Sequence, residues 1–277
     1  MAWRGRLALH YRRETHRTVL AHAHDGPLRV LKSLYPEAPS VCHNVLVHPP
    51  GGIVGGDTLA IDLRVEPGAH ALVTTPGATR FYRSRGETAT QALEARLEPG
   101  ARLEWLPMET ICHAGALVEN RLRFELAPGA QMIGADLLAL GLPASGAPFD
   151  AGRVDQSIEW PGVWLERTRI DAAADGRLLD SPLGWGGDRL LATLWFASGD
   201  PLPRERSEAL LDAARGVAAT HALAARCGAT SPEPRLVVLR ALAPRAEPAW
   251  TLLTAVWQAW RGLAWDLAAC PPRVWRT

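Results

Sequence analysis

The ten residues from His48 to Asp57 combine an imidazole, a carboxylate and an unusual density of glycine, at Gly51, Gly52, Gly55 and Gly56. Glycine accepts positive φ and lets the backbone approach a ligand closely, so loops that cradle phosphate share this composition. The spacing of Gly51 and Gly56 matches such a nucleotide-binding loop, but Asp57 occupies the position of its lysine. A carboxylate there repels phosphate, so the sequence predicts that the chain binds no nucleotide. Asp57 is then either a turn aspartate that bonds its own backbone, or an acid that lines a pore or binds a metal ion.

A second group of potential metal ligands consists of Glu109, Cys112 and His113. A carboxylate, a thiolate and an imidazole so close together suit a divalent ion such as nickel or zinc. Adjacent residues of a strand point to opposite faces, so Cys112 and His113 could share one ion only at a bend. The group is therefore either a metal-storage or metal-sensing module, or a buried cysteine beside a surface histidine. His22 and His24, on one face of an expected strand, form a further candidate metal pair.

The carboxylates Asp57, Glu104 and Glu109 leave open a β-structured enzyme that acts on a sugar or a small acid. The sequence contains neither G-x-S-x-G nor H-E-x-x-H, the local patterns of serine hydrolases and zinc proteases. The hydrolase interpretations are therefore weak, and the enzyme that uses these carboxylates is kept as the alternative.

Composition limits the cellular setting and the partners. The 277 residues carry a net charge of +1 with basic residues spread along the chain, which argues against nucleic acid as a partner. No apolar stretch is long enough to span a membrane, and the N-terminus lacks the apolar region of a signal peptide. The four cysteines are far apart and form no C-x-x-C pair, which fits reduced thiols better than disulfides. We expect a cytoplasmic protein.

A weak internal repeat organises the first 200 residues. A Pro-Gly pair recurs at intervals of 32, 29 and 33 residues, at Pro67-Gly68, Pro99-Gly100, Pro128-Gly129 and Pro161-Gly162. Pro-Gly at the centre of a turn favours type II, and alternating segments such as Ile61–Val65 and Leu122–Leu126 flank the pairs. The pattern predicts a mainly β protein built from Pro-Gly-turn hairpins, either as a coil of stacked strands or as an ordinary sandwich.

The sequence changes character after residue 200. Glu205–Arg226 has apolar residues at helical spacing and is expected to form a helix that stops at Gly228. Leu236–Leu239 predicts a buried strand, and Pro248–Leu267 predicts a second helix that carries four tryptophans. Those tryptophans either pack in the core or present an exposed face to a partner. Because no linker separates the parts, we expect a single domain, residues 1–277, with a β-rich body (1–200) and a helix-strand-helix part (201–277).

Six runs carry a resemblance to a known family: His48–Asp57, Thr74–Ser84, Leu103–Pro107, Gly134–Asp136, Trp164–Arg167 and Asp180–Leu183. In this order and spacing, over roughly residues 45 to 185, they resemble the urease accessory proteins called UreD, or UreH in some bacteria. Within the first two runs, the residues that carry the structural motif are His48, Gly51, Gly52, Gly55, Gly56, Thr75, Pro76, Gly77, Arg80 and Tyr82.

The resemblance implies a superhelical stack of β-sheets with about two helices toward the C-terminus. It also implies a urease maturation factor, a chaperone-like scaffold and not an enzyme. Such a protein binds UreF, in an expected 2:2 complex, and UreF recruits the GTPase UreG before the assembly docks on the urease apoprotein. Nickel is then expected to pass transiently through an internal channel to the urease active site, so no tightly bound cofactor is expected.

Carboxylate oxygens are suitable transient ligands for a divalent ion, so the channel candidates are Asp57, Glu166, Glu104 and Glu109. Cys112 and His113 are kept as candidate metal ligands. The chain departs from the family at Leu142 and Ala147, where an arginine and a glutamate are usual. When both members of an ion pair are replaced together, no charge is left without a partner. This departure therefore predicts an apolar contact in place of an ion pair.

Overall fold

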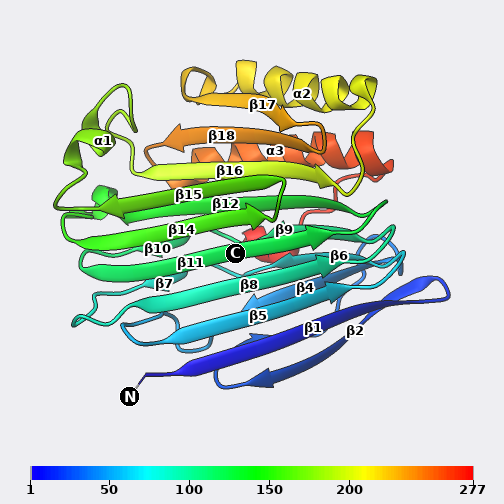
Figure 1. The fold of residues 1–277 in the computed structure, drawn as a ribbon, viewed down its shortest axis with the longest axis horizontal. Helices are drawn as coiled ribbons and strands as arrows, with labels where there is room; N and C mark the ends of the chain where they lie inside the picture. Colours follow the sequence, from blue (N-terminus) through cyan, green and yellow to red (C-terminus); the bar gives the residue numbers. More distant parts are fainter. Residues whose placement is uncertain (1, 277) are drawn as a thin grey trace.

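The computed structural model, which describes residues 2–276, consists of two stacked β-sheets with helices on the outer face of the larger one (Figure 1). Over these residues the smaller sheet has seven strands, in the order β15 (Trp164–Asp171), β14 (Gly152–Trp160), β11 (Ala116–Leu126), β8 (Ala89–Leu97), β5 (Thr58–Val65), β1 (Arg4–Glu14) and β2 (Arg17–Asp25).

The larger sheet has eleven strands within the same residues. Eight of them follow one another as β17 (Cys227–Glu233), β18 (Leu236–Ala243), β16 (Leu190–Ser198), β12 (Gln131–Leu142), β9 (Arg102–Leu106), β6 (His70–Thr74), β4 (Val41–Val47) and β3 (Arg29–Val30). Three short strands complete the sheet: β10 (Thr110–Cys112) and β13 (Ala147–Pro148) pair with β12, and β7 (Thr79–Phe81) pairs with β10.

The four Pro-Gly pairs form the type II turns that the sequence predicts. A backbone hydrogen bond of 2.9–3.0 Å closes each turn, from the N–H of its fourth residue to the carbonyl of its first. The central glycines have φ values of 68 to 77°, at Gly68, Gly100, Gly129 and Gly162. Glycine adopts this left-handed region without steric cost, which explains the recurrence of one residue pair.

The first three turns do not close hairpins, which corrects the prediction of hairpin units. Each leads from a strand of the smaller sheet to a strand of the larger one: β5 to β6, β8 to β9 and β11 to β12. Each strand then pairs in parallel with the equivalent strand of the next unit, as β5 does with β8 and β8 with β11. The units are therefore arches that stack, which confirms a coil of stacked strands over an ordinary sandwich. The fourth turn, between β14 and β15, does close an antiparallel hairpin.

The two sheets enclose one apolar core, and the helices cover a second. Inward side chains alternate along the strands of the smaller sheet, as Leu7, Leu9 and Tyr11 do on β1. The larger sheet is buried on both faces, so strands such as β4 and β16 are buried at nearly every position. Its outer face packs against α2 (Arg204–Ala219) and α3 (Ala246–Trp265). The β-rich body and the helical part thus share one sheet.

The C-terminal elements match the prediction in part. β18 contains the predicted strand Leu236–Leu239, and α3 covers most of the second predicted helix. α2, however, ends at Ala219 and not near Arg226, because the chain turns there to reach the sheet edge. Gly228 lies in β17, where it pairs with β18 and does not stop a helix. The other helices of residues 2–276 are short: α1 (Gly176–Asp180) and the 3-10 helices Pro143–Ser145, Ala224–Arg226 and Arg273–Arg276. None of the described helices has the length and apolar character to cross a membrane.

The tryptophans of α3 belong to the core. Trp257, Trp260 and Trp265 are at most 6% exposed, and each indole nitrogen donates a hydrogen bond to an acceptor. The packing interpretation is therefore confirmed, and the exposed tryptophan face proposed for a partner is wrong for these three residues.

Candidate functional site

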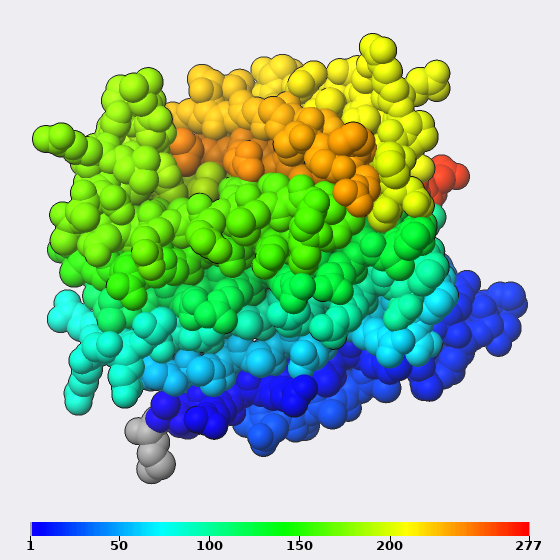
Figure 2. All heavy atoms as spheres, viewed as in Figure 1, coloured from blue at the N-terminus to red at the C-terminus, as the bar shows by residue number. Residues whose placement is uncertain are grey.

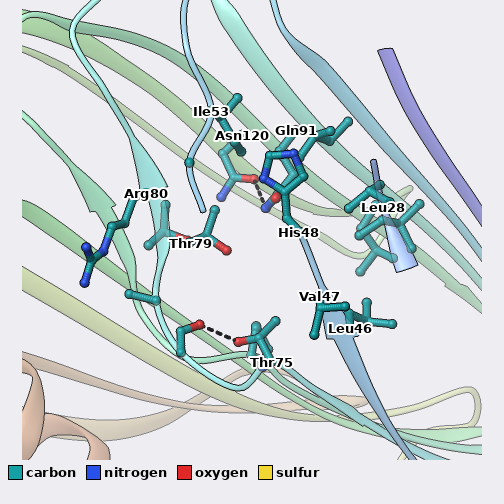
Figure 3. A pocket seen from close by; sticks show the side chains of 18 of the residues that line it. Leu28, Leu46, Val47, His48, Ile53, Thr75, Thr79, Arg80, Gln91 and Asn120 are labelled. Atoms are coloured by element: carbon teal, nitrogen blue, oxygen red, sulfur yellow. Dashed lines mark hydrogen bonds between the residues drawn. The ribbon is translucent and has the colours of Figure 1, made fainter. Parts of the chain in front are cut away.

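A cavity of about 270 Å³ between the two sheets is the candidate functional site (Figure 3). Residues of the two loops 48–53 and 75–80 form one wall. Gly51, Pro76 and Gly77 are exposed, so the cavity reaches the surface at these loops. Inward side chains of β5, β8, β9, β11 and β12 form the remaining walls. Two of the runs that the sequence singles out therefore meet at one place.

Asp136 of β12 places a carboxyl group on the cavity wall, where it is 6% exposed. Gln156 of β14 donates a hydrogen bond to it across the two sheets. Burial raises the pKa of Asp136 to about 7, and the nearby charge of Glu166 adds a smaller increase. The hydrogen bond from Gln156 lowers this pKa but does not offset the effect of burial. At neutral pH the group is therefore divided between its acid and carboxylate forms, and the carboxylate can bind a cation in place of the proton.

His48 stands on the loop wall of the same cavity. Burial lowers the pKa of His48, although the nearby negative charge of Asp57 acts to raise it. The imidazole is therefore uncharged at neutral pH and keeps a nitrogen lone pair for a metal ion. Gln91 donates a hydrogen bond of 3.4 Å to Asn120 on the cavity wall, drawn as a dashed line in Figure 3. The buried indole nitrogen of Trp105, also on the wall, has no hydrogen-bond acceptor among the described residues. Polar groups in apolar surroundings suit water and a weakly held cation.

The glycines of the first run allow the loops to pack closely. A Cβ on Gly52 would lie 2.0 Å from the ring of Tyr82, and one on Gly55 would lie 2.3 Å from Oγ of Ser84. The other two have φ values of 80 and 87°, at Gly51 and Gly56. The run is therefore required for the shape of the cavity wall and of the surface next to it.

Asp57 takes the turn role and not a place on the cavity wall. Its Oδ1 accepts the backbone N–H of Trp3 at 2.7 Å, and its Oδ2 accepts that of Val54 at 3.0 Å. Both oxygens are thus engaged in holding the loop. A contribution of Asp57 to metal passage stays a prediction.

Glu104 points away from the cavity, to the helix-covered face of the larger sheet. The next residue, Trp105, faces the cavity, because neighbours on a strand point to opposite sides. The fully buried Glu104 carboxylate accepts hydrogen bonds from Trp257 at 2.6 Å and from Arg261 at 3.2 Å, and it contacts His70 at 2.7 Å. These partners hold the pKa of Glu104 below its usual value against the desolvation that raises it. The residue joins α3 to the sheet.

Glu109 lines a separate cavity of about 150 Å³. Asp57, Glu104 and Glu109 therefore lie in three different surroundings. The arrangement provides no pair of carboxylates of the kind that the alternative enzyme requires.

The two positions at which the chain departs from the family pattern face each other. Leu142 pairs with Ala147 in the antiparallel ladder of β12 and β13, and Leu142 also lines the second cavity. The pairing places two apolar residues opposite each other, and the replacement of an ion pair by an apolar contact stays a prediction.

Cys112 and His113 point apart. Cys112 is fully buried between the sheets, where burial raises the pKa of its thiol well above the usual value. The His113 ring stacks on Tyr82, with ring centroids 4.7 Å apart. His22 and His24 are exposed on the edge strand β2, with ring centroids 6.2 Å apart. In the part of the chain that the structure describes, no group of three His, Cys, Asp or Glu side chains could hold a metal ion.

Glu166 of β15 pairs with Arg240 of β18, whose Nε lies 3.1 Å from both carboxylate oxygens. The ion pair connects the smaller sheet to the larger one. Glu166 does not line the cavity, but its charge contributes to the raised pKa of Asp136.

The sequence interpretation did not single out the most informative residue of the site, Asp136, although Gly134–Asp136 is one of the matching runs. A signal exists, because Asp136 is the one carboxylate in the otherwise apolar segment Met132–Leu142. Burying such a group is costly unless it is partnered or serves a function. Gln91, Asn120 and Gln156 carry no comparable signal, because their inward direction depends on strand pairing.

Comparison with known proteins agrees with this arrangement. The model of the family described as UreD urease accessory protein matches residues 4–276. The chain is 61% identical to the urease accessory protein UreD of Leptothrix cholodnii over 279 aligned residues, which cover both proteins completely. It is 58% identical to UreD of Variovorax paradoxus over all of both chains, and 59% identical to UreD of Paracidovorax citrulli over 99% of each. The chain therefore belongs to the UreD family of urease accessory proteins.

Proposed function

We propose that this protein is a urease maturation factor that conducts nickel through the cavity between its sheets to the urease active site. Its family supports a role in urease maturation. The observation that carries the nickel proposal is the buried carboxyl group of Asp136 in a cavity that the uncharged imidazole of His48 also lines. Nickel is the cargo and not a resident cofactor.

The two groups suit passage better than storage. Nickel binds both imidazole and carboxylate, but a tight site needs more protein ligands than one of each. A conduit must bind the ion well enough to admit it and weakly enough to release it. Water completes the coordination of the moving ion, and the polar groups Gln91 and Asn120 can bond that water.

We further propose that the chain works in the cytoplasm, binds UreF and through it UreG, and docks with them on the urease apoprotein. The free thiols of Cys42, Cys112, Cys227 and Cys270 are compatible with a reducing compartment. A 2:2 complex with UreF is the expected stoichiometry, and light scattering of the purified complex measures it.

Asp136→Asn tests the route. The asparagine keeps the size of the side chain and an oxygen that can accept from Gln156, but it removes the charge. In cells that co-express urease and its accessory proteins at limiting nickel, we expect urease nickel content to fall about tenfold or more, as metal sites respond to loss of one supporting group. Co-purification with UreF and urease should be unchanged.

Asp62→Asn is the matched control, because Asp62 is an exposed carboxylate paired with Arg6 on the outer face of the smaller sheet. It should leave nickel loading at the wild-type level. Normal nickel loading by an intact Asp136→Asn complex would contradict the cavity as the route.

A further inference from the structure

Three exposed arginines lie at the end of the cavity's second loop and in the segment that follows it. Arg80 lines the cavity with its neighbours, and in Figure 3 its side chain points away from His48 and Thr75. Arg83 and Arg85 follow in the next turn of the chain, and all three are exposed. In the space-filling view the cyan segment that contains them projects from the end of the molecule at which β1 begins (Figure 2). We call these three residues the arginine rim.

Packing holds the rim in place. Backbone hydrogen bonds tie the segment to both neighbouring loops: Ile53 donates to Arg80 at 2.8 Å, and Ser84 donates to Gly115 at 2.9 Å. The aliphatic part of Arg83 lies over Gly115, since a Cβ added to Gly115 would be 3.0 Å from Cγ of Arg83. Burial lowers the pKa of His113, and the positive charge of Arg80 nearby lowers it further. Arg80 therefore lies close to His113.

The rim is charged but unpaired. Among the described residues, none of the three guanidinium groups has a carboxylate or a hydrogen-bond partner. Other exposed arginines differ: Arg64 pairs with Glu98 at 2.9 Å on the outer face of the smaller sheet. The exposed acid in the same loop, Glu87, lies against Gly56 and not against the rim.

Large apolar side chains are exposed beside the rim. Trp3 is 51% exposed, Val54 45% and Tyr82 38%. They form one area, because Asp57 bonds the backbone of both Trp3 and Val54, and Tyr82 covers Gly52 two residues before Val54. Aromatic and arginine side chains are the types enriched at the centres of protein interfaces.

From this surface we propose that the arginine rim, with Trp3, Val54 and Tyr82, docks an acidic surface of the urease apoprotein over the mouth of the cavity. The inference rests on the proposed function and names the docking surface and its chemistry. Urease is the protein to which the relatives are accessory by their names, so it is the partner chosen here. Three guanidinium groups in a chain of net charge +1 form too small a basic area for nucleic acid, and the apolar neighbours favour a protein.

The rim also makes docking a condition for passage. Arg80 lines the cavity, and the unpaired positive charges of Arg80 and of the nearby Arg83 and Arg85 repel a divalent cation that approaches from this side. Carboxylates of the docked partner neutralise the arginines and add oxygen atoms that a divalent ion can bind. The mouth is therefore unfavourable for nickel until the acidic partner covers it, which limits loss of the ion to solvent.

The test compares triple variants, co-purified with UreF, for binding to immobilised nickel-free urease apoprotein. Arg80→Gln/Arg83→Gln/Arg85→Gln removes the rim charge. The matched control, Arg6→Gln/Arg64→Gln/Arg96→Gln, removes the same charge from arginines with carboxylate partners on the outer face of the smaller sheet. A third variant replaces the rim arginines by lysine. Each is measured at low and at high salt.

We expect the rim variant to bind about tenfold or more weakly at low salt, mainly through slower association, and to lose the salt dependence of the wild type. The outer-face control should bind within about twofold of the wild type, because exposed paired charges contribute little. The lysine variant should retain most of the binding and its salt dependence. Melting temperatures of the complexes establish that all three fold.

Two outcomes would overturn the inference: wild-type affinity of the rim variant, or a loss of UreF binding while urease binding persists. A wild-type complex that does not bind urease at all would instead contradict the proposed function.

Discussion

Asp136 is a residue whose charge opposes folding. Its pKa of about 7 lies above the usual aspartate value of about 3.9, so between these two pH values the folded state binds more protons than the unfolded state. The contribution of Asp136 to stability therefore falls as pH rises through this window. The carboxyl group is kept in spite of this cost, which is typical of a functional residue.

The stability of the Asp136→Asn variant relative to the wild type should therefore increase as pH rises. At pH 8 we expect the variant to be more stable than the wild type by up to about 4 kcal/mol, and the difference should shrink as pH falls toward 5. Urea denaturation of both proteins at pH 5.5, 7 and 8.5 measures it. A difference that does not change with pH would mean that the carboxyl group titrates near its usual value.

Gly134 is a residue fixed by a neighbour across the core. A Cβ at this position would lie 2.1 Å from the Trp195 ring, which itself stacks on Phe124. Gly134→Ala should therefore destabilise the protein by about 1–3 kcal/mol, the cost of overpacking a core. Gly216→Ala in α2 is the control, since nothing lies within 4 Å of its Cβ position and alanine favours a helix. Thermal melts should separate the two, and equal melting temperatures would contradict the packing argument.

At the scale of elements, α3 is anchored by a buried guanidinium group. Arg261 is fully buried and pairs with Glu104 and Glu37, while His43 contacts Glu37 at 2.7 Å. The anchor joins the helix to β9 and to the segment before β4, which are distant in the sequence.

Arg261→Met should cost about 3–5 kcal/mol, because it leaves the fully buried carboxylate of Glu104, and the partly buried one of Glu37, without their cation. The double variant Glu104→Gln/Arg261→Met should recover part of the lost stability, because the unpaired charge of Glu104 is then removed. Arg204→Met, which breaks an exposed pair with Glu208 on α2, should change nothing measurable. Denaturant unfolding with intrinsic tryptophan fluorescence follows all three, and an Arg261→Met protein as stable as the wild type would exclude the anchor.

The elements themselves are readable from the sequence, but their connections are not. The Pro-Gly turns, the strand at Leu236 and the helix from Pro248 follow from local rules of φ, alternation and periodicity. An arch and a hairpin share the same strand-turn-strand pattern, so the sequence does not say whether the second strand pairs with the first. The end of α2 at Ala219 is set by the sheet edge, although the residues that follow favour helix.

At the scale of the whole molecule, the same limit explains what could be predicted of the site. The two loops on the cavity wall stand out in the sequence because their composition is unusual. Asp136, Gln156 and Asn120 converge from strands that are adjacent only after the arches have stacked. Glu104 and Glu109 match the chemistry of a channel residue, but Glu104 points to the other face of β9, and Glu109 lies between β9 and β10 and lines the second cavity.

The stacked arches also bear on how the chain reaches its folded state. In this part of the molecule each parallel ladder joins residues about 30 positions apart, as Leu63 is paired with Ala95 and Ala95 with Phe124. The entropy of closing such loops must be lost before any ladder bond forms, so folding is expected to be slow, and apolar strands remain uncovered meanwhile. A newly made chain is thus prone to aggregate in proportion to its concentration. Its yield in the cell should therefore depend on synthesis rate and temperature as much as on the stability of the finished fold.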